Sequence, residues 1–166
     1  MKTKHLTRLA LLTAIALSIF IVELQIPMPV PIPGVKLGLS NIVTVYCMFS
    51  YGPWSALGVL LCRVVLGAIF SGRISALAYS LAGGILSWAM LCVLRRAVTE
   101  KQIWVCSVLS GLTHNLGQLL AAIVITGTPS ICVYFPVLAL SGMLAGLFTG
   151  LCAQALQARL RRLAQK

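Results

Sequence analysis

Aspartate is absent from this 166-residue chain, and glutamate occurs only at Glu23 and Glu100. Magnesium ions are held in proteins mainly through carboxylates, so the chain alone cannot assemble an aspartate-rich magnesium site. The six cysteines stand singly, without the paired spacing of a metal or redox motif. The sequence also contains no nucleophile–base pair and no phosphate-binding loop. These absences predict a chain that is not an enzyme by itself and that has no metal or cofactor.

Charged residues of both signs are scarce. They make up 9% of the chain, while 60% of the residues are hydrophobic; a soluble domain carries roughly 25% charged residues. From Gln102 to Ala158 there is no Lys, Arg, Asp or Glu. Such a stretch is typical of membrane-spanning segments. We therefore expect residues 1–166 to form a single, all-α integral membrane domain.

Prolines, glycines and charged residues divide the chain into six predicted membrane-spanning helices. Alternating prolines along residues 27–33 block helix continuation and predict an extended outer loop over residues 25–36. A helix needs about 20 residues to cross a bilayer, so the second predicted span is marginal. The predicted spans are residues 6–24, 37–51, 54–71, 74–94, 103–125 and 133–157.

The basic residues predict how the chain sits in the membrane. The net charge is +11, but the basic residues separate apolar segments and do not cluster on a soluble face, which argues against a nucleic-acid partner. With six spans both termini share one side, and Lys and Arg collect on the cytoplasmic side. We therefore expect cytoplasmic termini. Ten of the 13 basic residues lie on that side: Lys2, Lys4, Arg8, Arg95, Arg96, Lys101, Arg159, Arg161, Arg162 and Lys166.

Two ionisable residues lie within or close to the predicted spans. Arg63 falls near the middle of the third span, where a charge must face protein or a water-filled cavity. It is a candidate binding residue, and a structural arginine bonded to backbone carbonyls is the alternative. Glu23, near the outer end of the first span, is expected to pair with Lys36 or Arg73 at the outer rim, or to lie among the lipid head groups.

Three hydrogen-bonding side chains interrupt the apolar fifth span. His114 and Gln118 are four residues apart and share a helix face, and Asn115 adjoins them. Two interpretations stay open, because such residues either line a ligand cavity or hydrogen-bond a neighbouring helix. Aromatic residues are few, so a flat-ring stacking cage is not expected. The candidate substrate-binding residues, predicted to form a donor-rich region open to the outer side, are Lys36, Asn41, Arg63, Arg73, His114, Asn115 and Gln118.

Small residues recur every four positions on two of the predicted helices. Ala10 and Ala14 do so on the first, and Gly142, Gly146 and Gly150 on the last. Small residues at this spacing let helices approach closely. We expect the glycines to pack inside the protein and the two alanines to dock an external partner.

The pattern of six spans, a structured outer loop and Ala10-xxx-Ala14 resembles the substrate-binding (S) components of energy-coupling-factor transporters. Four segments, together spread over most of the chain, are similar to a bacterial family with two names, the Gx transporter family and heptaprenyl diphosphate synthase component I. They are PGVKLGLSNIVTVY (33–46), YSLAGGILS (79–87), THNLGQLLAA (113–122) and PVLALSGMLAGLFTG (136–150).

The resemblance implies an S-component-like helix bundle in the bacterial cytoplasmic membrane. It would bind a small solute, anionic or isoprenoid-related, and dock through Ala10 and Ala14 on a transmembrane coupling subunit driven by two ATPases. The alternative is a non-catalytic accessory subunit beside a soluble prenyl diphosphate synthase in menaquinone-type side-chain synthesis. A purely structural scaffold would leave Arg63 without a role.

Overall fold

The computed structural model describes residues 2–25, 38–72, 75–99 and 102–164, and every regular element within them is helical. Five of these helices are long and apolar enough to cross a membrane. The predicted all-α architecture is therefore confirmed for the described residues. In chain order the elements are α1 (Lys2–Glu23), α2 (Asn41–Ser50), α3 (Pro53–Ser71), α4 (Ser75–Leu94), α5 (Ile103–Thr126), the 3-10 helix η2 (Pro129–Tyr134) and α6 (Phe135–Ala164).

The second helix is much shorter than a membrane span. α2 has 10 residues and is about 15 Å long, whereas the hydrocarbon core is about 30 Å thick. Five of the six predicted spans therefore correspond to helices of membrane-spanning length, whereas the second, predicted over residues 37–51 and marginal in length, corresponds to the shorter α2. Gly38 and Gly52 flank α2 with φ angles of 71° and 98°, a backbone region that an α-helix cannot continue through. Asn41, expected one turn inside the helix, is its first residue.

The last helix is longer than predicted. The expected span ended at residue 157 and left a basic tail, but α6 continues to Ala164 and is 30 residues long. Arg161 and Arg162 therefore lie in its final turn. At the preceding connection, α5 ends at Thr126 and is followed by Gly127 with φ 64°. The 3-10 helix η2 lies between this turn and α6. The remaining helices begin and end close to their predicted bounds.

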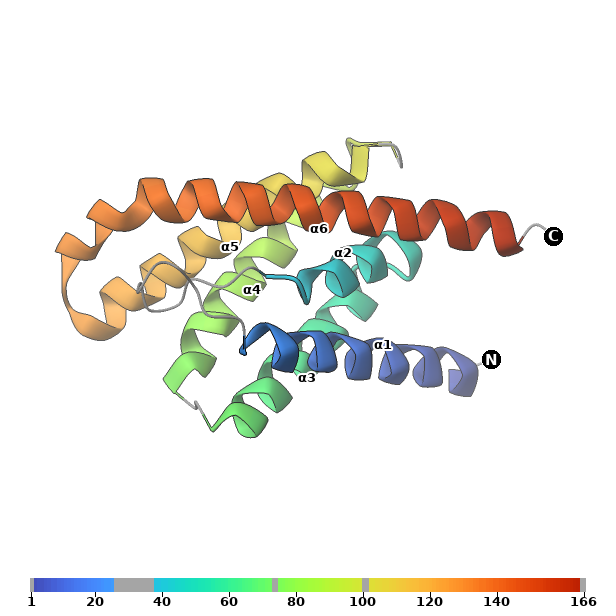
Figure 1. Cartoon of the computed structure of the whole chain (residues 1–166), viewed down its shortest axis with the longest axis horizontal. Coiled ribbons are helices and arrows are strands. Elements are labelled where there is room, and N and C mark those ends of the chain that lie inside the picture. The colour runs from blue at the N-terminus through green and yellow to red at the C-terminus, as the bar shows by residue number, and fades with distance from the viewer. Residues whose placement is uncertain (1, 26–37, 73–74, 100–101, 165–166) are drawn as a thin grey trace.

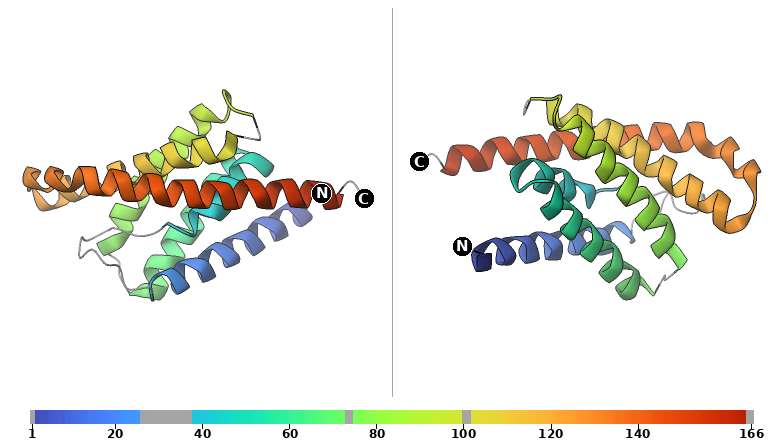
Figure 2. Two further views of the ribbon diagram at one scale, coloured as in Figure 1. Left: turned by 45° about the horizontal axis from the view of Figure 1, so that its top comes forward. Right: turned by 180° about the vertical axis from the view of Figure 1, so that it is seen from behind.

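The helices form an elongated bundle with both chain termini at one end and η2 at the other (Figure 1). α6 runs along the length of the molecule in both views of Figure 2. The short α2 lies inside the bundle, where Val45, Cys47 and Met48 are at most 1% exposed. Ala16 of α1 and Leu91 of α4 belong to the same hydrophobic core. α2 thus packs at the centre of the bundle. A helix can occupy this position without spanning the membrane.

α5 packs closely against the helices on both sides of it, through glycines. A Cβ atom placed on Gly111 would lie 2.2 Å from the Gly142 carbonyl oxygen of α6, and one on Gly117 would lie 2.8 Å from the Ala82 oxygen of α4. Gly146 likewise lies against the backbone of Ser107. These contacts confirm that the glycines of α6 pack inside the protein, because only residues without a side chain let backbones come this near.

We expect Gly111→Ala to destabilise the protein by about 1 to 3 kcal/mol, the range for overpacking a filled site. The new methyl group would collide with α6 backbone that cannot rotate away. Gly58→Ala in α3 is the matched control, because a Cβ there meets nothing within 4 Å; replacing this helical glycine should stabilise by up to about 1 kcal/mol. Tryptophan fluorescence during thermal unfolding in detergent measures both. Equal unfolding midpoints for the two variants would contradict the packing described.

Candidate solute-binding cavity

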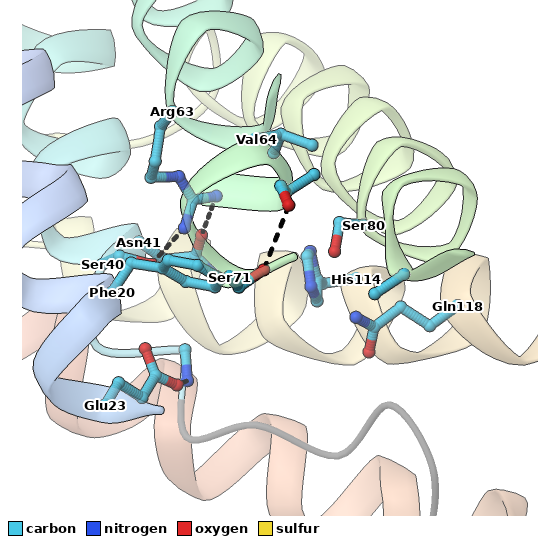
Figure 3. Close-up of a pocket in the computed structure, with 13 residues that line it drawn as sticks. Phe20, Glu23, Ser40, Asn41, Arg63, Val64, Ser71, Ser80, His114 and Gln118 are labelled. Carbon is cyan, nitrogen blue, oxygen red and sulfur yellow. Dashed lines mark hydrogen bonds between the residues drawn. The ribbon is translucent and has the colours of Figure 1, made fainter. Parts of the chain in front are cut away.

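Arg63 lies near the middle of α3 with only 6% of its surface exposed. Its guanidinium points toward the start of α2 (Figure 3), where its terminal nitrogens donate hydrogen bonds to Ser40 Oγ and, at 3.3 Å, to Asn41 Oδ1. Both partners are side chains, so these bonds are not those of an arginine held by backbone carbonyls. The buried Nε has no hydrogen-bond partner among the described residues.

Glu23, the last residue of α1, is buried in the same region with 6% of its surface exposed. Its Oε1 accepts a hydrogen bond of 2.5 Å from the backbone N–H of Gly38. Its Oε2 is buried without a hydrogen-bond partner among the described residues. The expectation that Glu23 lies among lipid head groups is therefore wrong. Glu23 was alternatively expected to pair with Lys36 or Arg73, and both of these residues lie outside the described residues.

Arg63 and Glu23 line one cavity, together with residues of α1 to α5 and the turn before α2 (Figure 3). Its volume is about 40 Å³, enough for about three water molecules at 10 to 15 Å³ each. Phe20, Val64, Ala68 and Ala76 supply apolar wall. The polar lining residues are Glu23, Ser40, Asn41, Arg63, Ser71, Ser80, His114 and Gln118.

The three hydrogen-bonding side chains of α5, His114, Asn115 and Gln118, do not all face the same way. His114 and Gln118 line the cavity, and Gly83 of α4 makes room for them, since a Cβ there would lie 2.8 Å from Gln118 Cγ. Asn115 turns the other way. Its Nδ2 donates to the Leu138 carbonyl oxygen at 2.6 Å and to Ser141 Oγ at 3.4 Å, both on α6. The structure thus places Asn115 between helices and outside this cavity.

The structure brings together four of the seven predicted binding residues around this cavity: Asn41, Arg63, His114 and Gln118. Asn115 instead joins α5 to α6 and lines a separate void of about 20 Å³. The predicted residues Lys36 and Arg73 lie outside the described residues. That the four cavity residues bind a ligand stays a prediction.

Sequence reasoning did not name Ser40 or Ser80, although both line the cavity. Ser40 accepts the Arg63 bond, and the sequence signal for it was present, because it directly precedes Asn41. Glu23 was singled out as one of only two acids, but not as part of the binding site. Ser80 carries no local signal, because serines are common in transmembrane helices and only the packing of α4 turns this one inward.

The cavity offers groups suited to polar recognition. Among the described residues, no group of three His, Cys, Asp or Glu side chains is placed to hold a metal ion. The cavity instead contains one guanidinium, one carboxylate, serine hydroxyls, two amides and an imidazole. Such groups fix the orientation of a small polar molecule by hydrogen bonds.

A family model for heptaprenyl diphosphate synthase component I matches residues 12–156. The chain belongs to this family. The match covers α2 to α5 in full and most of α1 and α6, so it includes every residue that lines the cavity. The comparison with curated proteins found no match, and neither did the comparison with solved structures.

We expect Asn115→Ala to lower the free energy of unfolding by about 0.6 to 1.7 kcal/mol, the range for hydrogen bonds between transmembrane helices. The substitution removes the bonds from Asn115 to α6 while leaving the cavity lining unchanged. Thr126→Ala is the matched control, because the Thr126 hydroxyl bonds only within its own helix, to the Ala122 carbonyl oxygen. Thermal unfolding in detergent compares the two. An Asn115→Ala midpoint no lower than that of the control would argue against a packing role.

Proposed function

We propose that this protein is the substrate-binding membrane subunit of an energy-coupling-factor-type uptake system and that it binds a small polar solute. The buried Arg63 carries the proposal. An arginine within a membrane span is costly, and this one borders a cavity with seven other polar side chains, including Glu23 and His114. A scaffold that only packs helices has no need for such a cavity.

The face of α1 that bears small residues supports docking on a membrane partner. Ala10, Ala14 and Ser18 are all exposed. Leu11 and Ile15, which directly follow the two alanines, are exposed as well, at 61% and 43%. If the chain docks as the S components that it resembles do, Ala10 and Ala14 would contact a transmembrane coupling subunit that is driven by two ATPases. The family match itself points to a partner subunit, since its description names one component of a complex.

The proposed orientation follows the basic residues. Both termini lie at the same end of the bundle (Figure 1), and Arg161 and Arg162 lie in the last turn of α6 at that end. Because Lys and Arg collect on the cytoplasmic side, we place this end in the cytoplasm of a bacterial cell. The solute then enters from the opposite, outer side.

The second candidate function is a non-catalytic accessory subunit of a heptaprenyl diphosphate synthase. The description of the matching family favours it. The lack of aspartate means that a partner enzyme would have to supply the magnesium-binding motifs. Its docking site would be the basic end of the bundle, because an aspartate-rich soluble enzyme is attracted to positive charge.

Purification of the tagged protein from its native membrane in mild detergent separates the two candidates. We expect a transmembrane coupling subunit and two ATPases to be recovered with it and identified by mass spectrometry. Recovery of a soluble prenyl diphosphate synthase without ATPases would overturn the transporter and support the accessory subunit.

The same purification tests the docking face. Ala14→Leu should reduce recovery of the coupling subunit at least about tenfold, because a bulky side chain separates closely packed helices. Ala155→Leu is the control, since Ala155 is also exposed but lies on α6. Equal recovery with both variants would show that the partner does not bind at this face of α1.

A further inference from the structure

Among the described residues that line the cavity, Arg63 and Glu23 carry opposite charges, and each has one buried polar atom that no described residue satisfies. These atoms are Arg63 Nε, a donor, and Glu23 Oε2, an acceptor. The remaining polar atoms of these two side chains already have partners, since the Arg63 terminal nitrogens bond Ser40 and Asn41, and Glu23 Oε1 bonds Gly38. Buried polar atoms are almost always hydrogen-bonded in folded proteins. Arg63 and Glu23, which both line the cavity, thus keep hydrogen-bonding capacity beyond their described partners.

The charge balance of the cavity limits what that molecule can be. A lone arginine would favour an anion, as the sequence suggested. Glu23 changes this expectation, because its carboxylate borders the same 40 Å³ cavity and cancels the guanidinium charge. A simple anion would be attracted by Arg63 but repelled by Glu23. A simple cation would be attracted by Glu23 but repelled by Arg63. Only a ligand that carries both charges gains from both residues.

The N-terminus of α2 strengthens the donor side of the cavity. Gly38, Ser40 and Asn41, at the start of this 10-residue helix, line the cavity beside Arg63. A helix N-terminus carries a partial positive charge and N–H groups without intrahelical acceptors, so it favours an anionic group. The Ser40 side chain makes no capping bond to α2. The ligand's anionic end would thus lie toward Arg63 and α2, and its cationic end toward Glu23.

We infer that this cavity binds a small zwitterion, with a carboxylate or similar anionic group toward Arg63 and an ammonium or similar cationic donor toward Glu23. The inference rests on the proposed function, in that it names the class of solute that the subunit would bind. The small volume and mixed wall point to a molecule of amino-acid size. His114 and Gln118 complete the wall from α5.

The competing explanation is that Glu23 and Arg63 only neutralise each other in an unliganded protein. A buried charge whose partner is removed is strongly destabilising, so variants alone would not separate the two explanations. The decisive comparison therefore uses the unmodified protein with probe molecules.

Purified full-length protein is mixed with glycine, β-alanine and γ-aminobutyrate, and with the carboxylic acid and the alkylamine of matching chain length for each. We expect at least one zwitterion to raise the unfolding midpoint by about 3 to 6 °C once it exceeds its Kd tenfold. The matched acids and amines should leave the midpoint unchanged. An acid that stabilises as much as its amino acid would overturn the inference, and so would the absence of any shift at 10 mM probe.

Variants then assign the two ends of the site. E23Q and R63Q should each weaken binding of the stabilising zwitterion at least about tenfold, the loss expected for one charged hydrogen bond. R96Q is the control, because Arg96 is exposed at the end of α4 and does not line the cavity. Size-exclusion chromatography confirms that each variant is folded. Unchanged affinity in folded E23Q protein would contradict the placement of the cationic end.

Failure of this inference is distinguishable from failure of the transporter proposal. Zwitterion binding by a protein that recovers no coupling subunit would contradict the transporter while keeping the ligand class. Recovery of the coupling subunit by a protein that no zwitterion stabilises would contradict the ligand class alone.

Discussion

The close approach of α5 to α4 and α6 is the constraint on which this structure depends. In a membrane, lipid tails are as apolar as leucine, so helices associate through tight packing and hydrogen bonds. Gly117 lies against Ala82, and Gly111 lies against Gly142, with no space for even a methyl group. These contacts fix both the position and the rotation of α5. His114 and Gln118 consequently face the cavity, while Asn115 faces α6.

Much of the helical architecture was predictable from the sequence. Long uncharged runs, and the glycines or prolines that interrupt them, located α1, α3, α4 and α5. Both features determine helix bounds through residues that are close together in the sequence. The length of α2 was not predictable in the same way. Residues 37–51 read as one apolar run, and only the backbone at Gly38 reveals that the helix starts at Asn41. The extension of α6 was missed because its arginines resemble a polar tail, although Leu and Ala between them favour helix.

A residue of the candidate site was predictable only where its side chain is unusual in polarity for the segment that contains it. Arg63 stands out because a charge inside an apolar helix is anomalous. The role of Ser40 depends on how α2 packs against α3, which no local pattern encodes. The separation of Asn115 from His114 follows from helix geometry, since successive residues are rotated by about 100°. Which of the two faces the cavity is decided by neighbouring helices, and therefore lies beyond a single-sequence argument.

The length of α6 has a consequence for how the helix would fit a bilayer. At 30 residues it is about 45 Å long, roughly the full thickness of a bilayer with its head groups. In such a bilayer its arginine-bearing end would lie among the head groups, where each basic side chain near an anionic surface would add about 1 kcal/mol of attraction. The opposite end is tied to α5 through Gly142. Because a helix longer than the hydrocarbon core is accommodated by tilting, we expect α6 to cross a bilayer at an angle to its normal.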